Sequence, residues 1–400
     1  MNLEHLLTDE EKAIRGAIRE FVTKEIMPVR DKIENNESLI AEIHQKLVDM
    51  GIQEGAFPPE YGGTGPGSHV AFAIICEELA KGDAGIALSV GINGSILGPA
   101  MAVGNKAVMD KFIPLFCKHK TCFACLSMTD SSGGADSENP LLQGKGIATT
   151  ATLEGDEYVI NGAKSWPTHA GIASVYLTIC NTDPTLGEDG VALIYVPADA
   201  KGLSFGKPEE KMGFRTSVNG SIFYDNVRVP KEFRLAGPGV DAQMYAALAT
   251  GTQWHSTSMS LGTAQAAFDI ALNYTKDRKS GGKPVREWSL AASILADMAI
   301  RIEMTRAAFY NLASMLDHPE IYGPPFSNIL VAKASAVKIF GADTAVWVTN
   351  KAVELMGSNG ISKEYPMEKY LRDAKIPQLW LGGQQIARYR VARGYYKYEV

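Results

Sequence analysis

The chain has 400 residues, of which 46 % are hydrophobic, so it can bury the cores of two or three domains. Its net charge of -6 comes from interspersed acidic and basic residues, which offer no basic face to a phosphate backbone and argue against nucleic acid as a partner. No run of 18 apolar residues occurs and residues 1–11 are acidic and polar, so we expect no membrane span, no targeting peptide and a cytoplasmic location.

The five cysteines are an odd number in a chain too large to need disulfides, which fits a reducing compartment. Cys122 and Cys125 form a C-x-x-C pair, but no second pair and no histidine stands at zinc-binding spacing. We therefore expect no metal site. The apolar run around this pair predicts a buried strand.

Residues 1–120 have the pattern of a helical domain. Apolar residues recur at helical spacing over residues 8–51, 70–80 and 106–116. Residues 57–67 are rich in Pro and Gly, so they predict a loop between these helices.

Residues 121–233 predict a middle β domain. Runs of β-branched and aromatic residues are cut here by Gly, Asp and Asn, which is typical of short strands in a small β-barrel or sandwich. The runs are ATTATL, EYVING, VYLTIC, VALIYVP and SIFYDNVRVP.

Residues 234–400 predict a helical bundle. Ala, Met and Leu recur with a period of about 3.6 over residues 240–275 and 290–316. Helices, then strands, then helices along one chain indicate an α+β fold with segregated layers rather than an alternating α/β fold.

Two segments of the middle domain have residue types that suit a flavin nucleotide. Residues 128–136 place Ser and Gly in a turn whose main-chain N–H groups can cradle a pyrophosphate. Asn161 and Gly162 predict a hairpin turn, which would set Trp166 and Thr168 on one face of the next strand. A flat indole beside a hydroxyl suits an isoalloxazine ring. Each segment also has a plain structural interpretation, as an ordinary turn and as a core tryptophan.

The C-terminal third contains the motifs MGSNG at 356–360, EYPMEK at 364–369 and RDAKI at 372–376. Together with TDSSGGAD, NGAKSWPTHAG, DRK at 277–279 and LADMA at 295–299, they make the chain resemble the acyl-CoA dehydrogenase family over nearly its whole length. This resemblance implies an N-terminal helical domain, a middle β-barrel domain and a C-terminal four-helix bundle. It also implies a homotetramer that binds FAD between its subunits.

The same resemblance assigns FAD-binding positions. Met128 and Thr129 should contact the pyrimidine edge of the flavin, while Trp166 and Thr168 should flank the ring near N5. The other positions, some of which should reach a neighbouring subunit, are Ala135, Arg278, Ser280, Glu354, Leu355, Gly357, Ser358, Gly383 and Gln385. An arginine beside a diphosphate has a physical basis in its bidentate donor fork, although a surface ion pair is the plain alternative for Arg278.

Two of these positions depart from the family pattern. Ala135 stands where the family has a serine, which removes one hydroxyl donor to the pyrophosphate, and Ser137 is a candidate replacement. Gly281 stands where a phenylalanine is usual, three residues after Arg278. We therefore expect FAD binding that is altered in detail.

The family's catalytic glutamate has no counterpart at the positions where we expect it. In the family this glutamate removes a proton α to the thioester carbonyl while hydride leaves the β carbon for flavin N5. Its usual position is Leu381 here, a second is Thr252 on the first long C-terminal helix, and a third lies at residues 91–93, which read Gly-Ile-Asn. The positions expected to line the substrate pocket are Gly91, Asn93, Thr252, Gln253, Trp380, Leu381 and Gly382.

His255, one helical turn beyond Thr252, is the candidate general base, because an imidazole pKa of about 6.5 suits proton transfer at neutral pH. A satisfied core histidine is the alternative interpretation. The prediction is thus an FAD-dependent oxidoreductase of an acyl-CoA, with a short, branched or alicyclic acyl group and a non-standard or absent catalytic base. An electron-transfer flavoprotein or dioxygen is the expected acceptor.

Two alternatives to this function stay open. One is an oxidase or dehydrogenase of an alicyclic dienoyl-CoA, in which formation of an aromatic ring drives the reaction. The other is a non-catalytic protein that binds FAD and CoA esters.

Overall fold

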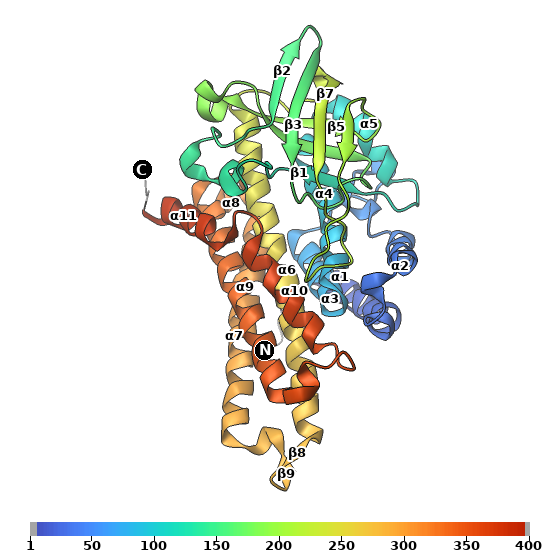
Figure 1. The fold of residues 1–400 in the computed structure, drawn as a ribbon, viewed down its shortest axis with the longest axis vertical. Helices are drawn as coiled ribbons and strands as arrows, with labels where there is room; N and C mark the ends of the chain where they lie inside the picture. The colour runs from blue at the N-terminus through green and yellow to red at the C-terminus, as the bar shows by residue number, and fades with distance from the viewer. Residues whose placement is uncertain (1–5, 397–400) are drawn as a thin grey trace.

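The computed structural model describes residues 6–396, so residues 1–5 of the polar start and residues 397–400 lie outside it. Helices from both ends of the chain pack beside a sheet formed by its middle (Figure 1). Helices, strands and helices follow one another along the chain without alternating. The predicted α+β class is confirmed.

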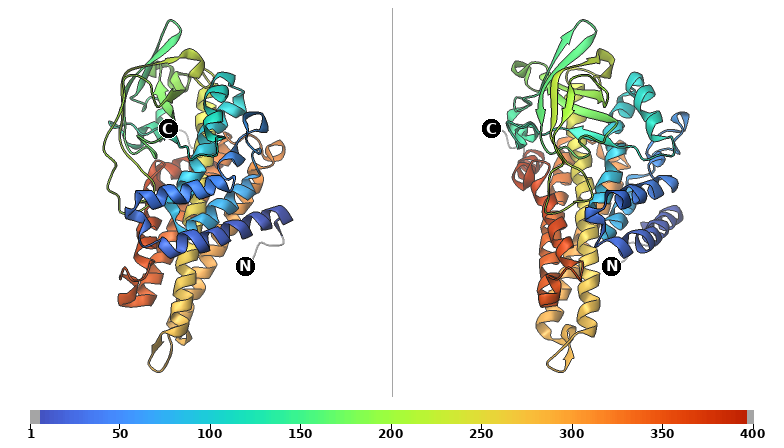
Figure 2. Two further views of the ribbon diagram at one scale, coloured as in Figure 1. Left: turned by 90° about the vertical axis from the view of Figure 1, so that its right-hand side faces the viewer. Right: turned by 45° about the vertical axis from the view of Figure 1, so that its right-hand side comes forward.

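The N-terminal helices begin at a well-formed cap. The Thr8 hydroxyl accepts a hydrogen bond from Glu11 N–H, while the Glu11 carboxylate accepts one from Thr8 N–H. The helices are α1 (Asp9–Phe21), α2 (Glu37–Asp49), α3 (His69–Gly82), α4 (Ala84–Val103) and α5 (Lys106–Phe116). They gather on one side of the long C-terminal helices (Figure 2).

The middle of the chain forms one seven-stranded sheet. Its strands are β1 (Ala124–Ser127), β2 (Thr150–Glu154), β3 (Glu157–Lys164), β4 (Val175–Asn181), β5 (Val191–Pro197), β6 (Leu203–Phe205) and β7 (Ile222–Pro230). They pair in the order β1-β4-β2-β3-β7-β6, and β5 pairs with β4. The five runs predicted to be strands correspond to β2, β3, β4, β5 and β7. Cys125 is buried in β1, as predicted.

The predicted hairpin turn at Asn161 and Gly162 was wrong. Both residues lie inside β3, where the register with β7 shifts between Ile160 and Gly162. Gly162 has a φ of +145°, and a Cβ there would come within 2.8 Å of Thr149 Oγ1, so the glycine allows a bulge and a close approach of two chains. The turn between β2 and β3 lies instead at residues 155–156.

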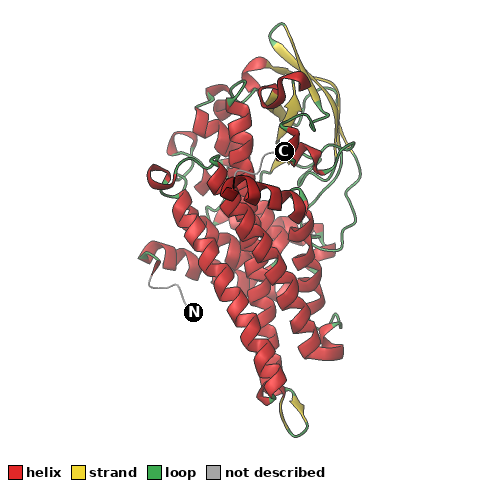
Figure 3. Ribbon diagram, turned by 90° about the vertical axis from the view of Figure 1, so that its left-hand side faces the viewer, coloured by secondary structure: helices red, strands yellow, loops and turns green. Residues whose placement is uncertain are grey.

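The C-terminal part of the chain is helical (Figure 3). It contains α6 (Val240–Asp277), a small hairpin of β8 (Lys279–Ser280) and β9 (Lys283–Pro284), α7 (Ser289–Leu316), α8 (Pro319–Tyr322), α9 (Asn328–Met356), α10 (Met367–Leu379) and α11 (Gly383–Tyr396). Helices α6, α7, α9 and α10 pack as a bundle around buried residues such as Met298, Phe309 and Val348. Helix α9 ends at Met356, and Gly357 follows it with a φ of +60°.

Helix α4 was not predicted from the spacing of its apolar residues. Its residues are apolar on nearly all sides, so no alternation of polar and apolar faces marks it as a helix. By length and composition alone it could cross a membrane, but it packs against α3, α6 and β1 and contributes to the core. Its buried position makes it one wall of the cavity described below.

A buried charge cluster joins the three parts of the chain. Lys369 of α10 contacts Asp373 at 2.6 Å and Asp83, which precedes α4, at 2.9 Å. Asp373 also accepts a hydrogen bond from the backbone N–H of Phe214, in the segment between β6 and β7 (2.7 Å). The two carboxylates raise the pKa of Lys369 despite its burial, so the lysine stays charged and holds the parts in register.

Candidate active site

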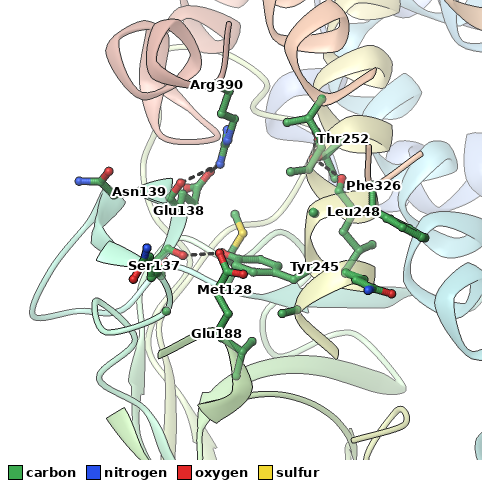
Figure 4. A pocket seen from close by; sticks show the side chains of 18 of the residues that line it. Met128, Ser137, Glu138, Asn139, Glu188, Tyr245, Leu248, Thr252, Phe326 and Arg390 are labelled. Carbon is green, nitrogen blue, oxygen red and sulfur yellow. Dashed lines mark hydrogen bonds and ion pairs between the residues drawn. The ribbon is translucent and has the colours of Figure 1, made fainter. Parts of the chain in front are cut away.

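Two cavities meet where the sheet faces α4 and α6. The larger has a volume of about 690 Å³ and lies between α4, α6, the segments after β1 and β3, and the loop of residues 380–383. The smaller has a volume of about 450 Å³ and lies between α6, the turn at 137–144 and α11 (Figure 4). The residues that line both cavities, which we call the throat, are Leu126, Met128, Glu138, Thr252 and Leu381.

A buried lysine holds the segment that follows β1. Lys164 Nζ donates a hydrogen bond to the carbonyl oxygen of Met128 (2.7 Å) and pairs with Asp130 (2.9 Å). Burial lowers the pKa of Lys164, and the Asp130 carboxylate opposes this shift. Met128, Thr129 and Ala135 are thereby fixed on the wall of the larger cavity.

Trp166 and Thr168 lie in the loop after β3, so their predicted place on a strand was wrong. Trp166 has a φ of +68° and leaves 55 % of its surface exposed in the single chain. Asn219 Nδ2 donates to the carbonyl oxygen of Trp166 (2.7 Å) and to Thr168 Oγ1 (3.2 Å). Both residues still line the larger cavity, because this bridge to Asn219 fixes the loop.

Lys211 also stabilises the bridge to Asn219. Its Nζ donates to the side-chain oxygen of Asn219 and to the carbonyl oxygen of Ser217. Burial lowers the pKa of Lys211 to about 8. This role could not be predicted from the sequence, because an ordinary surface lysine also stands in a polar segment.

The loop of residues 380–383 closes the other side of the larger cavity. Trp380 Nε1 donates to Ser256 Oγ on α6 (2.8 Å), and Lys338 Nζ donates to the carbonyl oxygen of Trp380 (3.2 Å). Leu381 follows with a φ of +54°, a conformation that a leucine rarely adopts. Trp380, Leu381, Gly382 and Gly383 all line this cavity.

The predicted base His255 lines the larger cavity one turn from Thr252, but its ring is tightly packed. Nε2 is buried without a hydrogen-bond partner, and a Cβ at Gly91 would lie 2.1 Å from it. Burial lowers the pKa of His255 to about 4, so the imidazole is neutral at pH 7.

Other predicted pocket positions lie outside the lining of both cavities. Asn93 links α4 to β1, because its amide donates to the carbonyl oxygen of Cys122 and its oxygen accepts from Ala124 N–H (2.9 Å each). Gln253 is buried, and neither end of its amide has a partner among the residues that the structure describes. Gly91 packs on His255. Gln385, a predicted cofactor position, is in α11 and also lines neither cavity.

The remaining predicted cofactor positions lie at the opposite end of the bundle. Arg278 and Ser280 are at the β8–β9 hairpin, and Asn359 Nδ2 donates to Tyr274 Oη (2.9 Å), which places the end of α9 beside them (Figure 1). Glu354, Leu355, Gly357 and Ser358 belong to this end of α9. Arg278 is 26 positions beyond Thr252, about 39 Å along the axis of a helix. These residues therefore cannot reach the cavity of their own chain.

The turn at 135–138 brings two residues to the smaller cavity, of which Glu138 was missed. Glu138 lies in the throat, and Arg390 Nη2 donates to its backbone carbonyl oxygen (2.9 Å). Ser137 Oγ is buried without a partner in the same cavity, while Tyr245 Oη donates to the Ser137 carbonyl oxygen (2.8 Å). The feature that identifies this part of the site is a glutamate and an arginine that are both buried. Their burial is known only from the folded structure, so the sequence alone did not reveal it.

Comparison with known proteins assigns the chain to a family. Residues 8–120, 125–227 and 239–396 match the acyl-CoA dehydrogenase N-terminal, middle and C-terminal domains. Cyclohexane-1-carbonyl-CoA dehydrogenase of Syntrophus aciditrophicus is 32 % identical and covers 96 % of both chains. Cyclohex-1-ene-1-carbonyl-CoA dehydrogenase of the same organism is 31 % identical over 96 % of this chain and 89 % of its own.

A solved structure agrees with these relatives. Butyryl-CoA dehydrogenase of Megasphaera elsdenii superposes with a TM-score of 0.87 at 29 % identity, covering 98 % of this chain and 99 % of its own. The members of the family are flavoproteins. The chain belongs to the acyl-CoA dehydrogenase family and is an oxidoreductase of the acyl-CoA dehydrogenase type.

Proposed function

We propose that this protein binds FAD in the larger cavity and transfers hydride between the flavin and a compact acyl-CoA, with a proton-transfer group that is not the family's glutamate. The observation that supports this proposal is the set of throat residues, which line both cavities. Thr252 and Leu381, two of the three expected positions of the base, border both the cavity lined by the expected flavin-binding residues and the second cavity.

The residues of the larger cavity fit a flavin. Its volume of about 690 Å³ lies within the range of cofactor sites. The exposed indole of Trp166 offers a flat face, and the Thr168 hydroxyl, which accepts from Asn219, keeps its own hydrogen for a ligand. Met128 and Thr129 would hold the pyrimidine edge. Ser137 lines only the smaller cavity, so it does not replace the hydroxyl that Ala135 lacks in the larger one. A bound flavin would supply a two-electron acceptor.

A homotetramer accounts for the second set of cofactor positions. Arg278 and the end of α9 cannot reach the cavity of their own chain, so they support FAD only in a neighbouring subunit. Arg278 is exposed in the single chain, as a residue that contacts a partner's cofactor must be. An electron-transfer flavoprotein is the proposed acceptor, with dioxygen as the alternative.

The acyl group that fits is compact and apolar. Leu88 and Ile92 of α4, Met259 of α6 and Trp380 give the larger cavity apolar surface that suits an apolar acyl group. The two relatives named for cyclohexane and cyclohexene acyl groups favour an alicyclic substrate. In an alicyclic dienoyl-CoA, formation of an aromatic ring would lower the barrier to oxidation, so the reaction would not need a strong base.

Anaerobic mixing of the FAD-loaded protein with butyryl-, cyclohexanecarbonyl-, cyclohex-1-ene-carbonyl- and cyclohexadiene-carbonyl-CoA tests this function. Bleaching of the flavin absorbance with one of these esters supports the proposal and identifies the acyl class. A spectral shift without bleaching by any of them would show the non-catalytic binding protein instead. A protein that takes up no FAD would contradict the proposal.

A further inference from the structure

Glu138 is the one ionisable side chain of the throat. The other throat residues are Leu126, Met128, Thr252 and Leu381, none of which can accept a proton at neutral pH. Glu138 ends the short 3₁₀ turn that begins at Ala135, and only 7 % of it is exposed. A buried carboxylate thus lies at the junction of the two cavities, on the same surface as the two positions that lack one.

The Glu138 carboxylate is paired loosely. Arg390 Nη2 is 3.9 Å from Glu138 Oε2, while the same nitrogen makes its short hydrogen bond to the Glu138 backbone (Figure 4). Lys338 of α9 and the N–H of Gly382 add weaker attraction. Burial outweighs these partners and raises the pKa of Glu138, which makes the ionised form a stronger base than an exposed glutamate.

His255 is less well placed for the same task. Its unpaired Nε2 faces Gly91 on α4, where even a methyl group would lie 2.1 Å away, so no substrate carbon can approach that lone pair. Its pKa of about 4 also makes it a weak base. Of the two candidates, Glu138 alone belongs to the throat that joins the cavities.

We propose that Glu138 is the catalytic residue that exchanges a proton with the α carbon of the acyl thioester. In the oxidative direction the α C–H bond breaks, an O–H bond forms on the Glu138 carboxylate, and the electron pair stays on the α carbon, delocalised into the thioester carbonyl as an enolate. In the reductive direction the protonated Glu138 returns the proton. This assignment rests on the proposed function, and it moves the base from the loop at Leu381 to the turn at 135–138.

Hydrogen–deuterium exchange isolates this step from hydride transfer. The FAD-loaded protein is chemically reduced beforehand, so that no oxidation can follow, and is incubated in D₂O with butyryl-CoA or cyclohexanecarbonyl-CoA, whose α carbons carry hydrogen. Mass spectrometry then measures deuterium at the α carbon. We expect Glu138→Gln to slow exchange by about 100-fold or more, while the affinity for the ester changes little.

Two further variants keep the test decisive. Glu232→Gln removes an exposed carboxylate that lines neither cavity and should exchange at the wild-type rate. Glu138→Gln with Arg390→Gln removes both buried charges, so it avoids an unpaired arginine and should show the same loss of exchange in a folded protein.

The outcomes separate the two proposals. Exchange by the wild type that persists within about threefold in both Glu138 variants would overturn the assignment and leave the proposed function intact. Loss of exchange in His255→Asn but not in Glu138→Gln would also overturn it. A wild type that neither exchanges the α hydrogen nor bleaches its flavin with any ester would overturn the proposed function and the assignment with it.

Discussion

The indole of Trp380 donates a hydrogen bond from Nε1 to the hydroxyl of Ser256, at 2.8 Å, and so ties the loop of residues 380–383 to the middle of α6. Trp380→Phe keeps a ring against Phe214 but leaves the buried Ser256 hydroxyl without this donor. We expect a loss of about 1 kcal/mol in the free energy of unfolding and a raised KM, because the loop lines the larger cavity. Urea denaturation and steady-state kinetics measure the two effects.

Trp288→Phe is the matched control for that change. Trp288 is 43 % exposed, and its Nε1 donates to the carbonyl oxygen of Ser280 at the far end of the bundle. An equal rise of KM in both variants would show that the loop is not what Trp380 controls.

Arg278→Ala should weaken FAD binding and subunit assembly together, since the proposed tetramer places this side chain on a neighbour's cofactor. Flavin fluorescence titration and light scattering measure the two properties. Lys276→Ala, two residues earlier and also exposed, should change neither. A variant that loses FAD affinity but keeps the wild-type mass would contradict the placement across the interface.

Leu381→Glu should create ordinary α,β-dehydrogenation of a saturated acyl-CoA, if a carboxylate at that position is all that such a reaction lacks. The φ of +54° is no more costly for Glu than for Leu, but a charge in this apolar surrounding carries a raised pKa. We therefore expect flavin bleaching by butyryl-CoA that is faster above neutral pH. A folded, FAD-loaded variant that binds the ester yet never bleaches would show that the pocket is shaped for different chemistry.

Stability should fall on mild acidification because of three buried histidines. Burial lowers the pKa of His44 and His255 to about 4 and that of His169 to about 3, from 6.5. The unfolded chain therefore binds protons that the folded one does not, so the contribution of these groups is complete above pH 6.5 and is lost as the pH falls towards 4. Each such proton costs about 1.4 kcal/mol per pH unit.

Urea denaturation at neutral and mildly acidic pH measures this slope. His169→Asn should flatten it by about one proton, because one titrating group is removed. His318→Gln should leave it unchanged, since the His318 side chain is 53 % exposed. A slope that is the same in His169→Asn and in the wild type would assign the effect to other groups.

Elements with a one-sided pattern were predictable from the sequence. Thr8 and Glu11 mark the start of α1, and the period-3.6 run after residue 240 became α6. Helix α4 was not recognised from its apolar spacing, because burial on every side removes the polar stripe that identifies a helix. Asn161 and Gly162 misled because the same dipeptide that favours a tight turn also accommodates a bulge, and only the approach of Thr149 decides between them.

The lining of the larger cavity was predictable where a resemblance could assign positions, as with Met128, Thr168 and Leu381. Glu138 was not, because its importance comes from contact with α11 and the loop at 380–383, far along the chain. Nothing in the local sequence distinguishes it from Glu188, which lines the same cavity on its exposed side.

Helix α6 carries Thr252 in its own throat and ends at Asp277, so that Arg278, the next residue, lies beyond the reach of that throat. In the proposed tetramer one helix therefore contributes residues to two sites, and each site contains residues from two subunits. A mixed assembly of Arg278→Ala chains and Glu138→Gln chains should then recover activity that neither parent has, because some neighbouring pairs combine an intact arginine from one chain with an intact glutamate from the other. Such complementation would mean that the effect of a mutation in one allele depends on the sequence of the other allele.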